Sequence, residues 1–224
     1  MIPKIIHYVW LGGKELPPLE TKCMLSWRKY NPEYEILCWD EQNLNINDPV
    51  YLKAYSKKQW AYCSDYARLK ILKENGGIYL DTDIEVVRCF DDLLNQKCFL
   101  GKENSNDLNA AIIGSVKGHE FICDVFDEIK LSLKTDFVPI PRILNSVYDD
   151  LKYKDVTVYD EEYFYPYNPF CNEIKLLFYC DVTTNTYAIH HWNYSWKPSF
   201  ASRIFRMTKR ILKGSKYFNY KEKI

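Results

Sequence analysis

Two carboxylates, Asp81 and Asp83, stand two residues apart directly after the apolar residues 78–80. In an extended segment, residues two apart face the same side, so both carboxylates are expected on one face and Thr82 on the other. Such a pair suits Mg²⁺ or Mn²⁺, which prefer oxygen ligands and commonly bridge protein carboxylates to substrate phosphates. Because this spacing also occurs by chance in solvated loops, the prediction of a metal-diphosphate site depends on the flanking residues.

A helix is expected just before these carboxylates. Its apolar residues recur at three- and four-residue steps, and two leucines widen the face: Trp60, Cys63, Ala67, Ile71, Leu69 and Leu72. Gly76 and Gly77 then end the helix, since glycine accepts the left-handed conformation found at helix C-termini. A helix, a glycine turn, a buried strand and carboxylates, in that order, indicate the ligand-binding edge of an α/β sheet.

Asp65 and Arg68 lie three residues apart and therefore share one face of this helix. An exposed pair at this spacing contributes only about 0.2–0.5 kcal/mol and usually has no function. Here the neighbouring residues are apolar, which favours a partly buried pair aimed at a polar ligand. Both residues are therefore candidates for catalysis and for substrate binding.

Trp10 ends an expected first strand and precedes Gly12 and Gly13, which permit a sharp turn and close approach of a ligand to the backbone. A tryptophan here could simply pack in the core. At the carboxyl end of a first α/β strand, however, its ring is also well placed to stack on a nucleotide base. The two glycines lack the G-x-G-x-x-G pattern, so a dinucleotide cofactor is not supported.

Near the other end of the chain, His190 and His191 stand side by side. If residues 186–192 are extended, the two rings point to opposite faces, and at most one of them serves the metal. A neutral imidazole is a reasonable ligand for Mn²⁺. A structural role for the pair is the competing interpretation.

The surrounding elements alternate between strands and helices. Strands are expected at residues 5–10, 34–39, 78–80, 99–101 and 110–115. Helices are expected at residues 19–30, 48–55, 119–133 and 140–151, in addition to the helix described above that ends at Gly76. This alternation predicts an α/β fold, with a mainly parallel central sheet flanked by helices. A chain of 224 residues, 47% of them hydrophobic, is sufficient for one large domain.

Charge and cysteine content narrow the class of protein. Thirty basic and thirty acidic side chains give a formal net charge of zero, so no nucleic-acid partner is expected. The eight cysteines form no C-x-x-C motif, and buried reduced thiols explain them better than disulfides or zinc. With no secretory signal and no apolar run long enough to cross a bilayer, a cytoplasmic location is expected.

The tail, residues 201–224, differs from the rest in composition. It contains one acidic residue, Glu222. Its basic residues are Arg203, Arg206, Lys209, Arg210, Lys213, Lys216, Lys221 and Lys223. Interspersed apolar residues make the tail amphipathic, which predicts peripheral binding of residues 203–224 to an anionic membrane surface, such as the inner face of the cell membrane. A solvated helix packed on the domain is the alternative.

Residues 61–83, AYCSDYARLKILKENGGIYLDTD, resemble glycosyltransferase family 32, the DXD-containing sugar transferases that include capsular-polysaccharide enzymes and yeast mannosyltransferases. Residues 2–13, IPKIIHYVWLGG, and residues 187–196, YAIHHWNYSW, fit the same family in the right order. The resemblance thus covers residues 1–200, and the glucosyltransferase domain of the large clostridial toxins is similar at a greater distance.

The resemblance implies a GT-A-like nucleotide-diphospho-sugar transferase fold, with residues 1–200 as the catalytic domain. It further implies a metal-dependent, retaining transfer of a hexose-type sugar. The donor would be a nucleotide-diphosphate sugar, a UDP-sugar before a GDP-sugar, and the cofactor Mn²⁺ or Mg²⁺. The acceptor would be a surface glycan or a lipid-linked saccharide, in capsule, exopolysaccharide or lipopolysaccharide synthesis.

The resemblance also distributes roles among the residues. Asp83 is expected as the leading metal ligand, and His190 as a second ligand. Asp81 would bind the metal, its waters or the ribose of the donor. Asp65 and Arg68 would hold the donor sugar. The remaining expected contacts are Trp10 on the base, and Ser195 and Trp196 near the diphosphate and the sugar.

Two questions about the chemistry stay open. Asn109 is a candidate sugar contact, or equally a loop asparagine, and no carboxylate is marked as a nucleophile. Front-face displacement, in which the diphosphate takes the acceptor proton, is therefore the working hypothesis for the mechanism.

Two other functions compete with the transferase. A phosphatase of the haloacid dehalogenase type also uses D-x-D, but on its first strand and with Thr or Val where this chain has Glu85. A non-catalytic protein that binds nucleotide-sugars could carry the same residues.

Overall fold

The computed structural model describes residues 1–132, 138–170 and 176–193, which belong to one compact unit, Met1–Asn193. Its strands are β1 (Ile5–Val9), β2 (Glu35–Trp39), β3 (Gly77–Leu80), β4 (Ile84–Val86), β5 (Cys98–Lys102), β6 (Leu108–Ser115), β7 (Val156–Tyr159) and β8 (Ala188–His190). Its α-helices are α1 (Pro18–Tyr30), α2 (Pro49–Ser56), α3 (Trp60–Asn75), α4 (Glu120–Ser132), α5 (Ile140–Val147) and α6 (Glu161–Phe164). Two 3₁₀ turns, η1 (Asp91–Leu93) and η2 (Tyr179–Asp181), complete the described elements.

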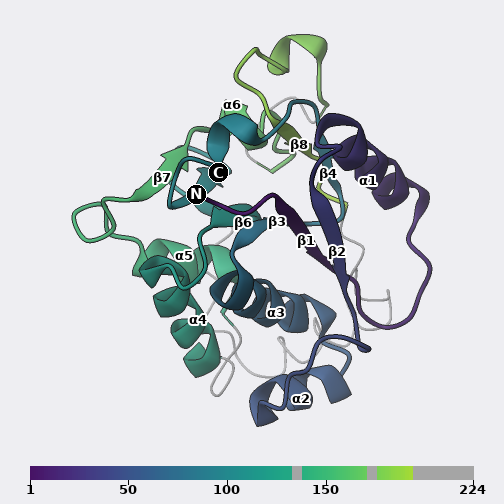
Figure 1. Ribbon diagram of the computed structural model, residues 1–224, viewed down its shortest axis with the longest axis vertical. Helices are drawn as coiled ribbons and strands as arrows, with labels where there is room; N and C mark the ends of the chain where they lie inside the picture. Colours follow the sequence, from purple (N-terminus) through teal and green to yellow (C-terminus); the bar gives the residue numbers. More distant parts are fainter. Residues whose placement is uncertain (133–137, 171–175, 194–224) are drawn as a thin grey trace, which may run out of the picture. The chain divides into compact units, whose positions relative to one another are not determined.

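Six strands form the central sheet in the order β2-β1-β3-β6-β5-β7 (Figure 1). Three of its five pairings are parallel, β1 with β2, β1 with β3 and β5 with β7, whereas β6 runs antiparallel to both of its neighbours. A second, two-stranded sheet joins β4 to β8. The predicted α/β fold with a mostly parallel central sheet is therefore confirmed, with β6 as the reversed strand.

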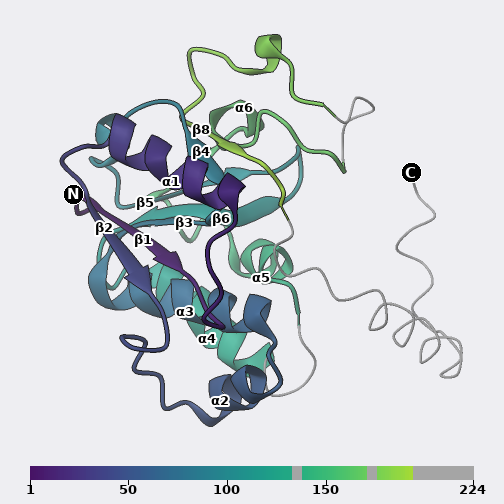
Figure 2. The ribbon, with the colours of Figure 1, turned by 90° about the vertical axis from the view of Figure 1, so that its right-hand side faces the viewer.

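The central sheet separates two hydrophobic layers. On one face, α3, α4 and α5 pack against the sheet, and on the other lie α1, α6 and the β4–β8 pair (Figure 2). Helix α3 is enclosed on nearly all sides, which places the charged pair Asp65 and Arg68 among buried residues. The second layer holds α1 against β4, because Trp27 donates its indole N–H to the Ile84 carbonyl at 2.6 Å.

Two local predictions were wrong, and three short strands were not predicted. Helix α5 ends at Val147 rather than at residue 151, because Asp149 accepts the Leu151 N–H and starts a turn. Gly76 has φ +69° and ψ −164°, which is positive-φ backbone but not the left-handed helical cap that was expected. The short β4, β7 and β8 were not predicted, since three or four residues carry too little periodicity to be recognised.

Glycine is required where α3 turns into β3. A Cβ added to Gly76 would lie 2.7 Å from the Lys117 backbone nitrogen, and one added to Gly77 would lie 2.7 Å from His7 Nε2. Both glycines also have positive φ, +69° and +100°. The close approach of three chain segments at this turn fixes where β3, and hence Asp81, emerges.

His7 on β1 is fully buried beneath this turn. Its Nδ1 accepts the indole N–H of Trp39 at 3.1 Å, so its Nε2 carries the proton and donates to the Gly76 carbonyl at 2.8 Å. Both ring nitrogens are satisfied only in the neutral form. Burial lowers the pKa of His7 to about 4, and the Gly76 carbonyl only partly opposes that shift.

Acidification is therefore expected to destabilise the fold through His7. The contribution of neutral His7 to the free energy of unfolding is complete above the ordinary pKa of 6.5. It is lost as the pH falls from 6.5 to the folded-state pKa of about 4. The loss amounts to about 3 kcal/mol. His7→Gln keeps one donor and one acceptor but does not titrate, so urea unfolding of both proteins between pH 7 and pH 4 isolates the effect. A stability difference that does not change with pH would contradict the assignment.

Two further observations concern the described part of the chain. None of its helices is sufficiently long and apolar to span a bilayer. Seven cysteines lie in it, and all seven are free thiols.

Candidate active site

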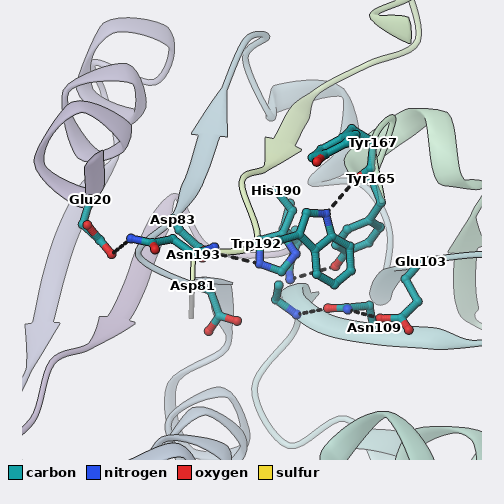
Figure 3. Close-up of polar contacts among 12 residues, drawn as sticks. Glu20, Asp81, Asp83, Glu103, Asn109, Tyr165, Tyr167, His190, Trp192 and Asn193 are labelled. Atoms are coloured by element: carbon teal, nitrogen blue, oxygen red, sulfur yellow. Dashed lines mark hydrogen bonds and ion pairs between the residues drawn. The ribbon is translucent and has the colours of Figure 1, made fainter. Parts of the chain in front are cut away.

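The candidate site lies at the edge of the sheet where the parallel strands β1 and β3 end. His7 on β1 is opposite Tyr79 on β3, so the residues that follow both strands, Trp10 and the segment from Asp81 to Asp83, reach the same edge. Ligands of open α/β sheets bind at such carboxyl ends. The β4–β8 pair brings His190 to this edge from a distant part of the chain (Figure 3).

Asp81 and Asp83 lie on a turn and not on extended backbone. The Ile84 N–H donates to the Asp81 carbonyl at 3.1 Å, which closes the turn between β3 and β4. The alternation argument for their common face was therefore wrong. The two carboxylates still converge, because the turn folds back toward β8: one ligand atom each of Asp81, Asp83 and His190 lie within 4.8 Å of one another.

One oxygen of Asp81 is held by two donors. Tyr79 donates its hydroxyl to Asp81 Oδ1 at 3.1 Å, and Arg68 Nη2 lies 3.1 Å from the same oxygen. Burial raises the pKa of Asp81, the Arg68 guanidinium opposes the rise, and the nearby Asp83 adds to it. The second carboxylate oxygen is outside these two contacts, which leaves it available to a ligand.

Arg68 links the two acids on either side of it. Its Nη2 also pairs with Asp65 Oδ1 at 3.0 Å, and its Nη1 donates to the Ala110 carbonyl at 2.7 Å. The guanidinium lies over the Tyr79 ring, 4.6 Å from the centroid. Burial raises the pKa of Asp65 although Arg68 opposes the shift. The expected pair on α3 is thus present, and it carries a contact to Asp81 that the spacing did not predict.

Asp83 is buried beside His190. Its Oδ2 lies 3.4 Å from His190 Nε2 and accepts the backbone N–H of Asn193 at 2.7 Å. Burial alone would raise the pKa of Asp83, but His190 and the Asn193 N–H outweigh it and hold that pKa below its ordinary value of 3.8. Asp83 is therefore an ionised carboxylate in this environment.

The two adjacent histidines face opposite sides, as the alternation predicts. His190 joins the aspartates, while His191 Nε2 bonds with Glu85 Oε2 at 2.8 Å on the other face of β4. The His190 ring packs against Trp192 in a tilted arrangement, with centroids 4.2 Å apart, and meets Tyr165 edge-on (Figure 3). Its orientation is thus set by packing.

The donor set fits a divalent cation. Two carboxylates and one imidazole, close enough to share one ion, suit Mn²⁺, and also Mg²⁺ with water completing its shell. His190 Nδ1 is buried and has no hydrogen-bond partner among the residues that the structure describes. The residues that would hold the ion are Asp81, Asp83 and His190.

The other candidates have different settings. Asn109 on β6 is buried, donates its amide to Glu103 and accepts the Ala111 N–H at 2.7 Å (Figure 3). It is therefore a strand residue whose side chain is fixed by hydrogen bonds, and not a loop asparagine. Trp10 is half-buried and donates its indole N–H to the Lys14 carbonyl at 2.6 Å. Contacts of Asn109 and Trp10 with a donor stay predictions. Ser195 and Trp196 lie outside the described residues, as does the basic tail.

Sequence reasoning missed several residues of this site. Tyr79 supports Asp81 through its hydroxyl. Figure 3 shows two others: Glu103, which accepts the Asn109 amide, and Glu20, which accepts the amide of Asn193 beside Asp83. The available signal was a single carboxylate near the start of a helix, Glu20, or just after a strand, Glu103. Such positions are too common in sequences to single out.

Removal of the Tyr79 hydroxyl is expected to weaken the site without disrupting it. Tyr79→Phe leaves the ring under Arg68 but deletes the donor to Asp81, so turnover should fall about tenfold and the free energy of unfolding by about 1 kcal/mol. Tyr66→Phe is the matched control, since Tyr66 on α3 donates its hydroxyl to Asp48 instead. Steady-state kinetics and urea unfolding should show similar stability losses but a kinetic loss only for Tyr79→Phe. Equal kinetics in the two variants would contradict the role of Tyr79.

Sequence comparison supports this geometry. The family described as "glycosyltransferase sugar-binding region containing DXD motif" matches residues 17–100. An uncharacterized glycosyltransferase of Acanthamoeba polyphaga mimivirus is 31% identical over 219 residues, which cover 88% of this chain and 85% of the viral protein. Inositol phosphoceramide mannosyltransferase 3 of Schizosaccharomyces pombe is 30% identical over 129 residues, covering 55% of this chain. The alignment spans 36% of that yeast protein.

Solved structures of low sequence identity share the fold. The PaToxG glycosyltransferase has a TM-score of 0.57 at 19% identity, over 65% of this chain and 68% of that one. The galactosyltransferase LgtC has a TM-score of 0.53 at 15% identity, over 92% of this chain and 95% of that one. In this fold, the D-x-D follows β3 and not the first strand, where a haloacid dehalogenase-type phosphatase would carry it. The chain belongs to the GT-A-type glycosyltransferases whose sugar-binding region contains a DXD motif.

Proposed function

We propose that this chain is a metal-dependent, retaining glycosyltransferase that moves a hexose-type sugar from a nucleotide-diphosphate sugar to a saccharide acceptor. A UDP-sugar is the first choice of donor and a GDP-sugar the second. The observation that carries the proposal is the convergence of Asp81, Asp83 and His190 within 4.8 Å at the carboxyl edge of β1 and β3. No dinucleotide or nucleic-acid chemistry is needed to explain these residues.

The charge balance of the site suits a diphosphate leaving group. A bound Mn²⁺ or Mg²⁺ would stabilise the negative charge that develops on the diphosphate as the sugar leaves. Asp83 is ionised and oriented by Asn193, so it is ready to hold the ion, with His190 beside it. Arg68 opposes the rise that burial causes in the pKa of Asp81, and it contacts only one carboxylate oxygen, which leaves the second for the ion, its waters or the donor ribose.

We assign the base and the sugar of the donor to different residues around the three candidate metal ligands. Trp10 would stack on the base, since it ends β1 at the same edge of the sheet. Asp65 and Arg68 would hold the donor sugar, together with Asn109 on β6. On the basis of the sequence alone, Ser195 and Trp196 would lie near the diphosphate and the sugar. The amide of Asn109 is preoriented by Glu103, which limits how it can meet a sugar hydroxyl.

The reaction is assigned to a front-face displacement. The anomeric carbon–oxygen bond of the donor breaks, the acceptor oxygen bonds to the same carbon on the same face, and the acceptor proton passes to the leaving diphosphate oxygen. This route needs no carboxylate nucleophile. Glu103, another carboxylate of the site, is already engaged by the Asn109 amide.

For the acceptor, we propose a surface glycan or a lipid-linked saccharide. The yeast relatives that match over a third of their length are named for mannosyl transfer to inositol phosphoceramide, a lipid. Residues 203–224, basic and amphipathic in sequence, would hold the protein at an anionic membrane near such an acceptor. Sedimentation with anionic vesicles tests this part: wild-type binding after deletion of residues 203–224 would refute it.

A donor panel tests the function itself. The protein is incubated with Mn²⁺ and each of several UDP- and GDP-sugars, and sugar release or transfer is measured, with phosphomonoesters in parallel. Donor turnover that stops on chelation of the metal is the expected result. Phosphate release from simple monoesters, or donor binding without any turnover, would contradict the transferase.

A further inference from the structure

The first turn of α1 contains an acid in an unusual environment. Glu20 is 0% exposed to solvent, although carboxylates are rarely buried without partners. Its Oε1 accepts the side-chain amide of Asn193 at 2.8 Å, and its Oε2 has no hydrogen-bond partner within the described ranges. A buried acid with one bond costs folding free energy, so its single partner indicates where its function lies.

That partner, Asn193, lies between two carboxylates. Its side-chain amide donates to Glu20, and its backbone N–H donates to Asp83 Oδ2 at 2.7 Å (Figure 3). Asp83 is therefore held by a residue that is itself held by α1. The contact joins chain positions 110 and 173 residues apart, through a residue just beyond β8.

The backbone beside Asn193 is in a conformation that requires such support. Trp192 has φ +54°, which bulky residues rarely adopt, and this turns the chain directly after β8. Trp192 is fixed on its other side by the indole N–H bond to the Tyr167 carbonyl at 2.7 Å. The bond from Asn193 to Glu20 secures the segment after the turn, so that its N–H stays directed at Asp83.

Helix α1 is a firm base for this bond. Trp27 and Ser26 tie it to β4, through the Ile84 carbonyl at 2.6 Å and the Val86 N–H at 2.8 Å. Strand β4 begins directly after Asp83. Hydrogen bonds thus connect α1 to the first and last residues of the strand that follows Asp83.

We propose that Glu20 is a positioning residue of the cation site, which acts through Asn193 to fix the orientation of the Asp83 carboxylate. The inference rests on the proposed function, since it assigns Glu20 to the same ion. Glu20 works as a hydrogen-bond acceptor, because its contact is with Asn193 and not with Asp81, Asp83 or His190. Residues that orient metal ligands in this way typically change metal affinity by about 10–100-fold.

Direct binding of Mn²⁺ in the presence of UDP, followed by electron paramagnetic resonance, tests the proposal without any turnover. Glu20→Met, which removes the acceptor at similar volume, should weaken Mn²⁺ binding about tenfold. Glu20→Gln keeps an acceptor for Asn193 and should bind within about threefold of the wild type. Thr21→Ala, beside Glu20 on α1, removes only an exposed hydrogen bond to the Pro17 carbonyl and should bind Mn²⁺ as the wild type does.

Asn193→Ala tests the same hydrogen bond from its other side, so the result does not depend on whether Glu20→Met folds correctly. It removes the amide donor to Glu20, retains the backbone N–H to Asp83, and should match the tenfold loss. Wild-type Mn²⁺ affinity in Glu20→Met or Asn193→Ala, or equal losses in Glu20→Gln and Glu20→Met, would overturn the proposal.

Asp83→Asn separates this failure from that of the proposed function. If the wild type binds Mn²⁺ and Asp83→Asn does not, the cation site stands and only the role of Glu20 is at stake. If wild type and Asp83→Asn bind Mn²⁺ equally, or neither binds, the cation site itself is refuted and the role of Glu20 with it.

Discussion

Replacement of Asp83 by asparagine is expected to lower kcat for sugar transfer by about 10³-fold, the largest functional effect of any single substitution in this chain. The side chain stays the same size and can still accept the Asn193 N–H, but its negative charge is lost. Asp83 is the site carboxylate whose surroundings favour the ionised form, since His190 and Asn193 hold its pKa below the ordinary value. A neutral amide at this position binds a hard cation far less well.

The measurement is single-turnover transfer with saturating donor over a range of Mn²⁺ concentrations. Glu85→Gln is the matched control: it lies two residues further on, pairs with His191 on the other face of β4 and should keep near-wild-type kcat. Urea unfolding of each variant shows that the fold is intact. Undiminished donor turnover in Asp83→Asn would refute the proposed mechanism.

Replacement of Arg68 by methionine is expected to have the largest effect on stability, a loss of about 3–5 kcal/mol in the free energy of unfolding. Arg68 is buried, and its removal leaves the Asp65 and Asp81 carboxylates without their cation and the Ala110 carbonyl without its donor. Two like charges would then repel each other in a medium that solvates them poorly. Turnover should fall as well, because Asp81 loses one of the two donors that orient it.

Urea unfolding at neutral pH measures this loss, and a double substitution identifies its origin. Asp65→Asn combined with Arg68→Met removes one of the uncompensated charges, so the double variant should be more stable than Arg68→Met alone. Lys70→Met on the same helix serves as the control. Its exposed pair with Glu74 contributes about 0.3–0.5 kcal/mol, and its substitution should cost no more. A loss as small in Arg68→Met would contradict the role of Arg68.

The local elements around the site were predictable from the sequence. Apolar spacing and the two glycines indicated α3, the turn and β3, because helix and strand periodicities depend on neighbours a few residues apart. The pairing of Asp65 with Arg68 followed from the same helical geometry. Alternation correctly separated the two histidines, and the structure shows that His190 is the one beside the aspartates.

Where the chain departs from regular backbone, the sequence misled. Asp81 and Asp83 were expected on a strand, but they occupy a turn that the Ile84 N–H closes. Their convergence is produced by the pairing of β4 with β8, two three-residue strands about 100 residues apart. Pairing over such a distance depends on packing in the whole domain, which no local pattern encodes.

By itself, the sequence determined the class of chemistry, since the types of residue at the end of β3 and near residue 190 are those that hold a divalent cation and a diphosphate. Only the tertiary structure decided how those residues are oriented. Arg68 is joined to Asp81, and Glu20 to Asn193 and so to Asp83, by bonds between distant segments. Hydrogen bonds of this kind form where burial removes water as a partner, and burial is a property of the folded domain as a whole.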